Sequence, residues 1–106
     1  MGRFVIAAYT PKPGKIEALK SAVRKHMDVL RAEGLVTDRP AYVMRAGDGT
    51  VIEVFEWRST EAIAKAHATP AVHALWAEFE QACDYRAPGD LPECRQLVPE
   101  FESITP

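Results

Sequence analysis

Residues 40–59 read PAYVMRAGDGTVIEVFEWRS, and this stretch decides the fold class. Residues 40–46 and 51–58 carry β-branched and aromatic residues and have the length of strands. Between them, Gly47-Asp48-Gly49-Thr50 contains the Asp-Gly pair that is typical of a tight hairpin. The two strands are therefore predicted to pair antiparallel.

The patterning on both sides of this hairpin predicts the remaining elements. They are a strand at 3–9, a helix at 15–33 that stops at Gly34, helices at 59–68 and from residue 70 to about residue 83, and a last strand within 95–104. Because Pro99 cannot donate a ladder hydrogen bond, it belongs at a sheet edge or a bulge, and the predicted topology places the last strand at the edge. The order predicts one α+β domain over residues 1–106: a ferredoxin-like split βαβ with a four-stranded antiparallel sheet and helices on one face.

Composition narrows the possible partners. The chain has 106 residues, of which 47% are hydrophobic and 26% charged, as expected of one globular domain. Its net charge of -2 offers no basic surface for nucleic acid or for an anionic membrane. No apolar run approaches the roughly 20 residues of a membrane span, and the first residues lack a signal-peptide pattern. A cytoplasmic protein is expected, with Cys83 and Cys94 as free thiols.

The strand at 51–58 has apolar side chains on both faces. Phe55 and Trp57 point to one side of the sheet, and Ile52 and Val54 point to the other. If the sheet face without helices were left in solvent, it would expose a large apolar patch. Two sheets are therefore predicted to pack together in a homodimer that closes a dimeric α/β barrel. The alternative is that the loop at 86–93 folds over this face.

Three segments resemble the antibiotic biosynthesis monooxygenase-like proteins of the dimeric α+β barrel superfamily. They are YTPKPGK at 9–15, IEVFEWRS at 52–59 and AHATP at 66–70. The resemblance implies a dimer with a pocket between helices and sheet in each protomer. Well-studied members oxygenate polycyclic phenols or quinols without metal or flavin, and others degrade haem or isomerise lactones. Trp57 and His67 match family positions.

Two departures limit which family chemistry carries over. The oxygenating and haem-degrading members depend on an asparagine near the reacting atoms, and this chain has no asparagine. The haem degraders also place an axial histidine where this chain has Trp76. Haem binding is therefore not expected.

His67 and Glu53 are the predicted catalytic residues. Helical spacing from Ile63 turns His67 inward, where a neutral imidazole can remove a phenolic proton. The alternative is a core histidine that is hydrogen-bonded to a carbonyl or to Glu53. Glu53 lies among apolar neighbours and must be paired or protonated, so it orients His67 or holds a ligand hydroxyl. Its alternative is a surface ion pair with Arg3 or Arg45.

Four aromatic residues are predicted to line a ligand pocket, although aromatic residues at such spacing can equally be plain core. They are Trp57, Phe55, Trp76 and Phe79. No metal site is expected, because the three histidines have no metal-ligand spacing. The predicted function is a cofactor-independent monooxygenase-like protein acting on a small aromatic or quinol-type metabolite. The alternative is a non-catalytic ligand-binding or stress-associated dimeric barrel.

Overall fold

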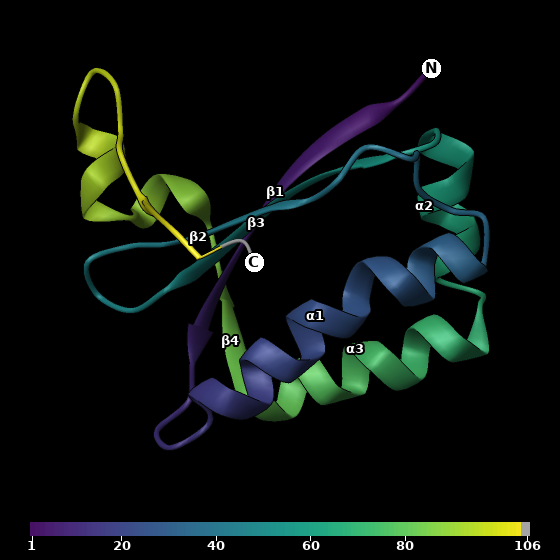
Figure 1. Ribbon diagram of the computed structural model, residues 1–106, viewed down its shortest axis with the longest axis horizontal. Helices are drawn as coiled ribbons and strands as arrows, with labels where there is room; N and C mark the ends of the chain where they lie inside the picture. Colours follow the sequence, from purple (N-terminus) through teal and green to yellow (C-terminus); the bar gives the residue numbers. More distant parts are fainter. Residues whose placement is uncertain (105–106) are drawn as a thin grey trace.

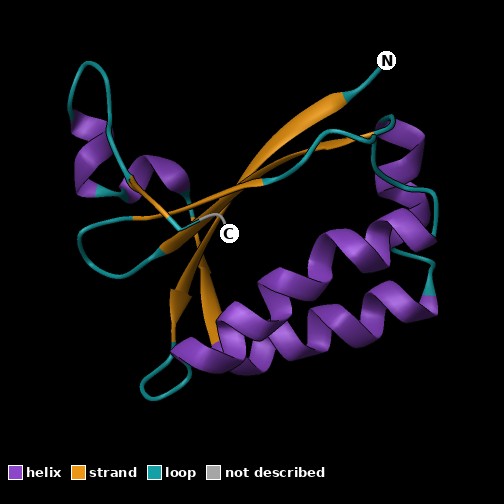
Figure 2. Cartoon of the chain, in the orientation of Figure 1, coloured by secondary structure: helices purple, strands orange, loops and turns teal. Residues whose placement is uncertain are grey.

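In the computed structural model, which describes residues 1–104, five strands form one antiparallel sheet, and two long helices lie side by side across one of its faces (Figures 1 and 2). The elements are β1 (Arg3–Pro11), α1 (Ile16–Ala32), β2 (Tyr42–Arg45), β3 (Val51–Trp57), α2 (Thr60–Ala66), α3 (Pro70–Ala82), β4 (Cys83–Arg86), the short 3-10 helices η1 (Pro88–Asp90) and η2 (Pro92–Arg95), and β5 (Glu102–Ser103). The strand order is β4-β1-β3-β2-β5, with β3 at the centre. The α+β class is confirmed, and the order of β1 to β4 is consistent with a ferredoxin-like fold.

The predicted fourth strand is in a different place. Residue 83 follows Phe79 by one helical turn, which suggested that the third helix continued to it. Instead α3 ends at Ala82, Cys83 has extended backbone angles, and β4 begins there and pairs with β1. The segment within 95–104 supplies only the two-residue β5, which pairs with β2 at the opposite edge. The sheet therefore has five strands rather than four, and the edge position expected after Pro99 is confirmed.

The end of α1 and the turn of the β2–β3 hairpin lie where the sequence predicts, because a glycine at each point adopts a left-handed backbone conformation. Gly34 has a φ of 70° just past α1, and the Leu35 amide donates to the carbonyl of Leu30 at 3.0 Å. Gly49 has a φ of 93° in the β2–β3 hairpin, where Asp48 accepts from the Thr50 amide at 2.9 Å. This hydrogen bond lowers the pKa of Asp48 below its usual value.

The face of the sheet away from α1 and α3 is partly covered. Leu91, from the loop between η1 and η2, is buried against Ala8, Ala46 and Ile52. The alternative prediction, that the loop at 86–93 folds over this face, is therefore right for one end of the sheet. Elsewhere on this face large apolar side chains are exposed to solvent: Phe4 is 63% exposed, Ile6 is 59% exposed and Tyr42 is 61% exposed. Within residues 1–104, no helix is both long and apolar enough to cross a membrane.

Candidate functional site

The carboxylate of Glu53 is the centre of the candidate site. Glu53 is fully buried on the central strand β3, on the face that α1 covers. Its Oε1 accepts a hydrogen bond from the hydroxyl of Tyr9 on β1 at 2.8 Å and lies 2.7 Å from Nδ1 of His26 on α1. A buried carboxylate is costly unless donors surround it. Tyr9 and His26 therefore stabilise Glu53 by hydrogen bonding to one of its two carboxylate oxygens.

Tyr9 is fixed as a hydrogen-bond donor. The register of β1 and β3 pairs Tyr9 with Val51, which makes its side chain a diagonal neighbour of Glu53 on the same face. Burial, with the nearby negative charge of Glu53, raises the pKa of Tyr9 above its ordinary value. The Tyr9 phenol therefore keeps its proton and donates it to the hydrogen bond with Glu53. It does not act as a base that would take a proton from a ligand.

His26 is held in one ring orientation. Its imidazole lies edge-on to Phe55 and to Phe79, with ring centroids 5.1 Å apart in both cases. Nδ1 faces Glu53, whereas Nε2 has no hydrogen-bond partner among residues 1–104. A ring packed in this way cannot swing off the carboxylate without losing both aromatic contacts.

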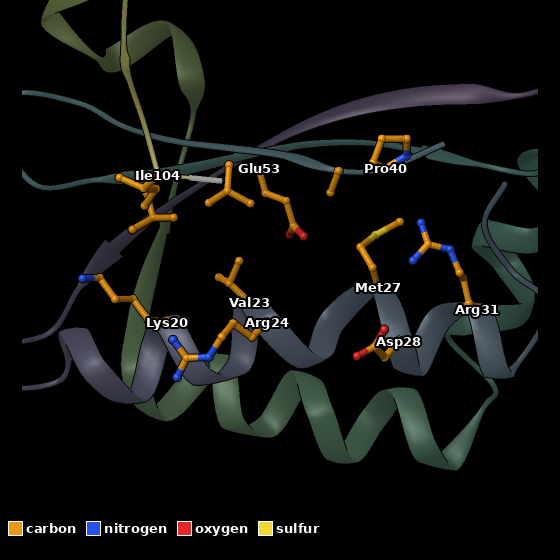
Figure 3. A pocket seen from close by; sticks show the side chains of 12 residues that line it. Lys20, Val23, Arg24, Met27, Asp28, Arg31, Pro40, Glu53 and Ile104 are labelled. Atoms are coloured by element: carbon orange, nitrogen blue, oxygen red, sulfur yellow. The ribbon is translucent and has the colours of Figure 1, made fainter. Parts of the chain in front are cut away.

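A pocket of about 690 Å³ opens between α1 and the β2–β3 part of the sheet. It is lined by Lys20, Val23, Arg24, Met27, Asp28, Arg31, Pro40, Ala41, Val43, Val51, Glu53 and Ile104. Figure 3 shows the Glu53 carboxylate pointing from the sheet toward α1, between Val23 and Met27. Its Oε2 is buried, and no hydrogen-bond donor reaches it from the described part of the chain. The site thus presents one acceptor oxygen among mostly apolar walls, which suits a ligand hydroxyl.

His67 does not belong to this site, and the prediction that it faces inward is wrong. α2 ends at Ala66, which takes the buried position, so the next residue turns about 100° toward solvent. The exposed imidazole of His67 rests on Trp76 with ring centroids 5.0 Å apart. The His67 carbonyl accepts a hydrogen bond from Nε2 of His73. A histidine does pair with Glu53, but it is His26.

The alternative for Glu53, a surface ion pair with Arg3 or Arg45, is also wrong. Glu53 is fully buried, and Arg45 instead pairs with Glu102 at 3.0 Å. Glu53 shares a face with Phe55 and Trp57, because all three are buried on the helix side of β3.

The four predicted pocket aromatics are packing residues around the site. Phe55, Trp57 and Phe79 are buried and Trp76 is half-buried, but none of them lines the pocket beside Glu53. Phe55 and Phe79 hold the His26 ring, and Trp57 packs on Phe55 with centroids 5.4 Å apart. Phe55 and Phe79 therefore shape the site through His26, whereas the pocket itself is lined by aliphatic and charged side chains.

Sequence reasoning missed Tyr9 and His26. A signal for His26 was available, because it follows Leu19 by seven residues and Val23 by three, which places it on the buried side of α1. The signal for Tyr9 was weaker, since its partner lies on a strand more than forty residues away.

Other reactive groups do not form a second centre within residues 1–104. No cluster of three His, Cys, Asp or Glu side chains suitable for a metal ion occurs there. Cys83 and Cys94 are free thiols, and burial raises the pKa of Cys83 to about 11.

Comparisons with known proteins support the fold. No family model and no curated protein matches the chain. The chain is similar to the solved structure described as "Structure of Rv0793 from Mycobacterium tuberculosis", with a TM-score of 0.63 and 21% sequence identity. The similarity covers 87% of this chain and 99% of that one. At this identity the likeness shows a shared small α+β fold.

Proposed function

We propose that the α1 pocket binds a small hydroxylated aromatic metabolite and that the protein is a cofactor-independent monooxygenase-like enzyme. The observation that carries this proposal is the Glu53 carboxylate, which is buried on the wall of an otherwise largely apolar pocket. Tyr9 and His26 hold its Oε1, and its Oε2 is left to accept a hydrogen bond. The assignment to oxygen chemistry rests on the sequence resemblance described above. Glu53 takes the role of base that the sequence had suggested for His67.

The proposed chemistry begins with the ligand hydroxyl. Glu53 accepts its proton, and the phenolate that forms gives electrons to dioxygen more readily than the phenol does. One oxygen atom enters an unsubstituted ring carbon beside the hydroxyl as a carbonyl, and the other leaves as water with the two hydrogens that the substrate loses. The substrate supplies all four electrons, so the equation balances as phenol plus dioxygen to quinone plus water.

Oxygen uptake tests this proposal. The protein is supplied with a panel of phenols, hydroquinones and naphthohydroquinones, with isotopically labelled dioxygen as co-substrate. The expected result is one labelled carbonyl oxygen and one water for each dioxygen consumed. Binding of the same compounds without oxygen uptake above the buffer rate would overturn the enzymatic proposal and favour the non-catalytic ligand-binding alternative.

We also propose that a second copy of the chain covers the open part of the sheet. Phe4 and Ile6 lie on that face of β1 and Tyr42 on that face of β2, while Ile6 and Tyr42 both pair with Val54 of β3 between them. The side chains therefore form a continuous apolar patch across three strands. The charged groups near this patch are Arg39, 5.9 Å from the Phe4 ring, and its partner Glu56, at the end away from Ile6 and Tyr42. A patch that is apolar around Ile6, Val54 and Tyr42 fits a copy of itself related by a two-fold axis.

Ile6→Lys should convert this dimer to a monomer. A two-fold axis places both new charges in the same apolar interface, so the dissociation constant should rise at least about 100-fold. Light scattering across a concentration series measures the change. The matched control is Leu97→Lys, because Leu97 is 99% exposed and lies outside the sheet. A monomeric wild-type protein at micromolar concentration would overturn the proposal.

A further inference from the structure

We infer that the ligand of the α1 pocket carries a carboxylate at the end opposite its hydroxyl, so that its class is a hydroxyaryl carboxylate. This inference rests on the proposed function for the hydroxyl end, because Glu53 is the group that receives it. The carboxylate end is argued from separate residues, on the helix side of the pocket.

Cationic side chains of α1 form the helix side of the pocket. Lys20, Arg24 and Arg31 line it, with Asp28 as the acidic residue among them. Figure 3 shows all four side chains on α1, which lies across the pocket from the strand that carries Glu53. The helix side therefore has an excess of positive charge, although the whole chain has a net charge of -2.

Two of these cations are free to bind a ligand. Arg31 already donates to the carbonyl of Arg39 at 3.0 Å. Within residues 1–104, by contrast, Lys20 and Arg24 have no carboxylate within ion-pair distance, and Asp28 pairs with neither of them. Lys25, on the other side of α1, does pair with Glu78 at 2.5 Å. On α1, the two cations without a partner, Lys20 and Arg24, thus both line the pocket.

The two ends of the pocket demand opposite chemistry from one molecule. Oε2 of Glu53 is fully buried and accepts, so it selects a hydroxyl and repels an anion. Lys20 and Arg24 stand one helical turn apart and donate, so they select an anion. The pocket is also lined by Val23, Val43 and Ile104, which offer apolar surface to a flat ring. A carboxylate on an aromatic frame with a distant hydroxyl satisfies all three regions.

Equilibrium titration with three probes tests the inference. The probes are a hydroxynaphthoate with its two groups at opposite ends of the ring system, the naphthol that lacks the carboxylate, and the naphthoate that lacks the hydroxyl. We expect hydroxynaphthoate to bind wild-type protein about tenfold more tightly than naphthol, the effect of two partly exposed ion pairs. In the double variant Lys20→Gln/Arg24→Gln, this advantage should fall to less than about twofold.

The controls separate the two proposals. Lys65→Gln removes an exposed cation of α2 that is outside the pocket and should keep the full advantage. If naphthol and hydroxynaphthoate bind equally, or the advantage survives in the double variant, the carboxylate inference is overturned. If Glu53→Gln leaves the affinity of both hydroxylated probes unchanged, or no probe binds, the proposed function fails as well.

Discussion

Replacing Glu53 by glutamine should lower the turnover of the phenolic substrate by about 10²–10⁴-fold, the usual contribution of a positioned general base. Glutamine keeps the shape of glutamate and can still accept from Tyr9 at 2.8 Å. At the position of Oε2, however, it offers either an amide that donates or an oxygen that is too weak a base. The substrate hydroxyl would then keep its proton, and electron transfer to dioxygen would start from the phenol.

Glu56→Gln is the matched control for this experiment. Glu56 lies on the same strand but on the opposite face, where it accepts from Thr37 at 2.9 Å and pairs with Arg39 at 2.9 Å. Its replacement should leave turnover within about twofold, since it touches neither the pocket nor the Glu53 cluster. Unfolding curves of both variants would show whether each is folded. A folded Glu53→Gln protein with wild-type turnover would rule Glu53 out as the base.

Local patterns predicted much of the fold. The β2–β3 hairpin, the extent of α1 and its stop at Gly34 depend on neighbouring residues and on glycine geometry, which can be read from a short window. The boundary between α3 and β4 could not be read in this way. Cys83 satisfies helical spacing, yet residues 83–86 become a strand because β1 offers them hydrogen bonds along its free edge.

In the candidate site, too, the sequence identified one residue and missed another. Glu53 was identifiable because a carboxylate between apolar neighbours on a central strand needs a partner. Spacing alone did not decide which histidine is the partner, because both His26 and His67 follow apolar residues at helical spacing. The helix ends decide between them: His26 lies in the middle of α1 under the sheet, whereas His67 is the residue at which α2 stops. Where a short helix ends depends on packing that spacing alone does not reveal.

Replacing His26 by leucine should lower the free energy of unfolding by about 3–5 kcal/mol, the cost of leaving a buried charge short of its partner. Glu53 would keep only the Tyr9 hydroxyl, because the imidazole of His26 is its other hydrogen-bond partner within residues 1–104. Leucine itself fills much of the space between Phe55 and Phe79, so the loss of packing is small. Chemical denaturation of the variant and of the wild type measures the difference.

The triple variant Tyr9→Phe/His26→Leu/Glu53→Leu distinguishes charge isolation from lost packing. It removes every member of the cluster together, so no donor or acceptor is left unpaired, and its free energy of unfolding should return to within about 1 kcal/mol of the wild type or exceed it. A triple variant that is less stable than His26→Leu would instead mean that the cluster holds the fold together. The expected recovery would mean that an apolar core serves stability equally well. In that case the buried carboxylate, with one oxygen held by Tyr9 and His26 and the other unpartnered, is kept for what the pocket binds.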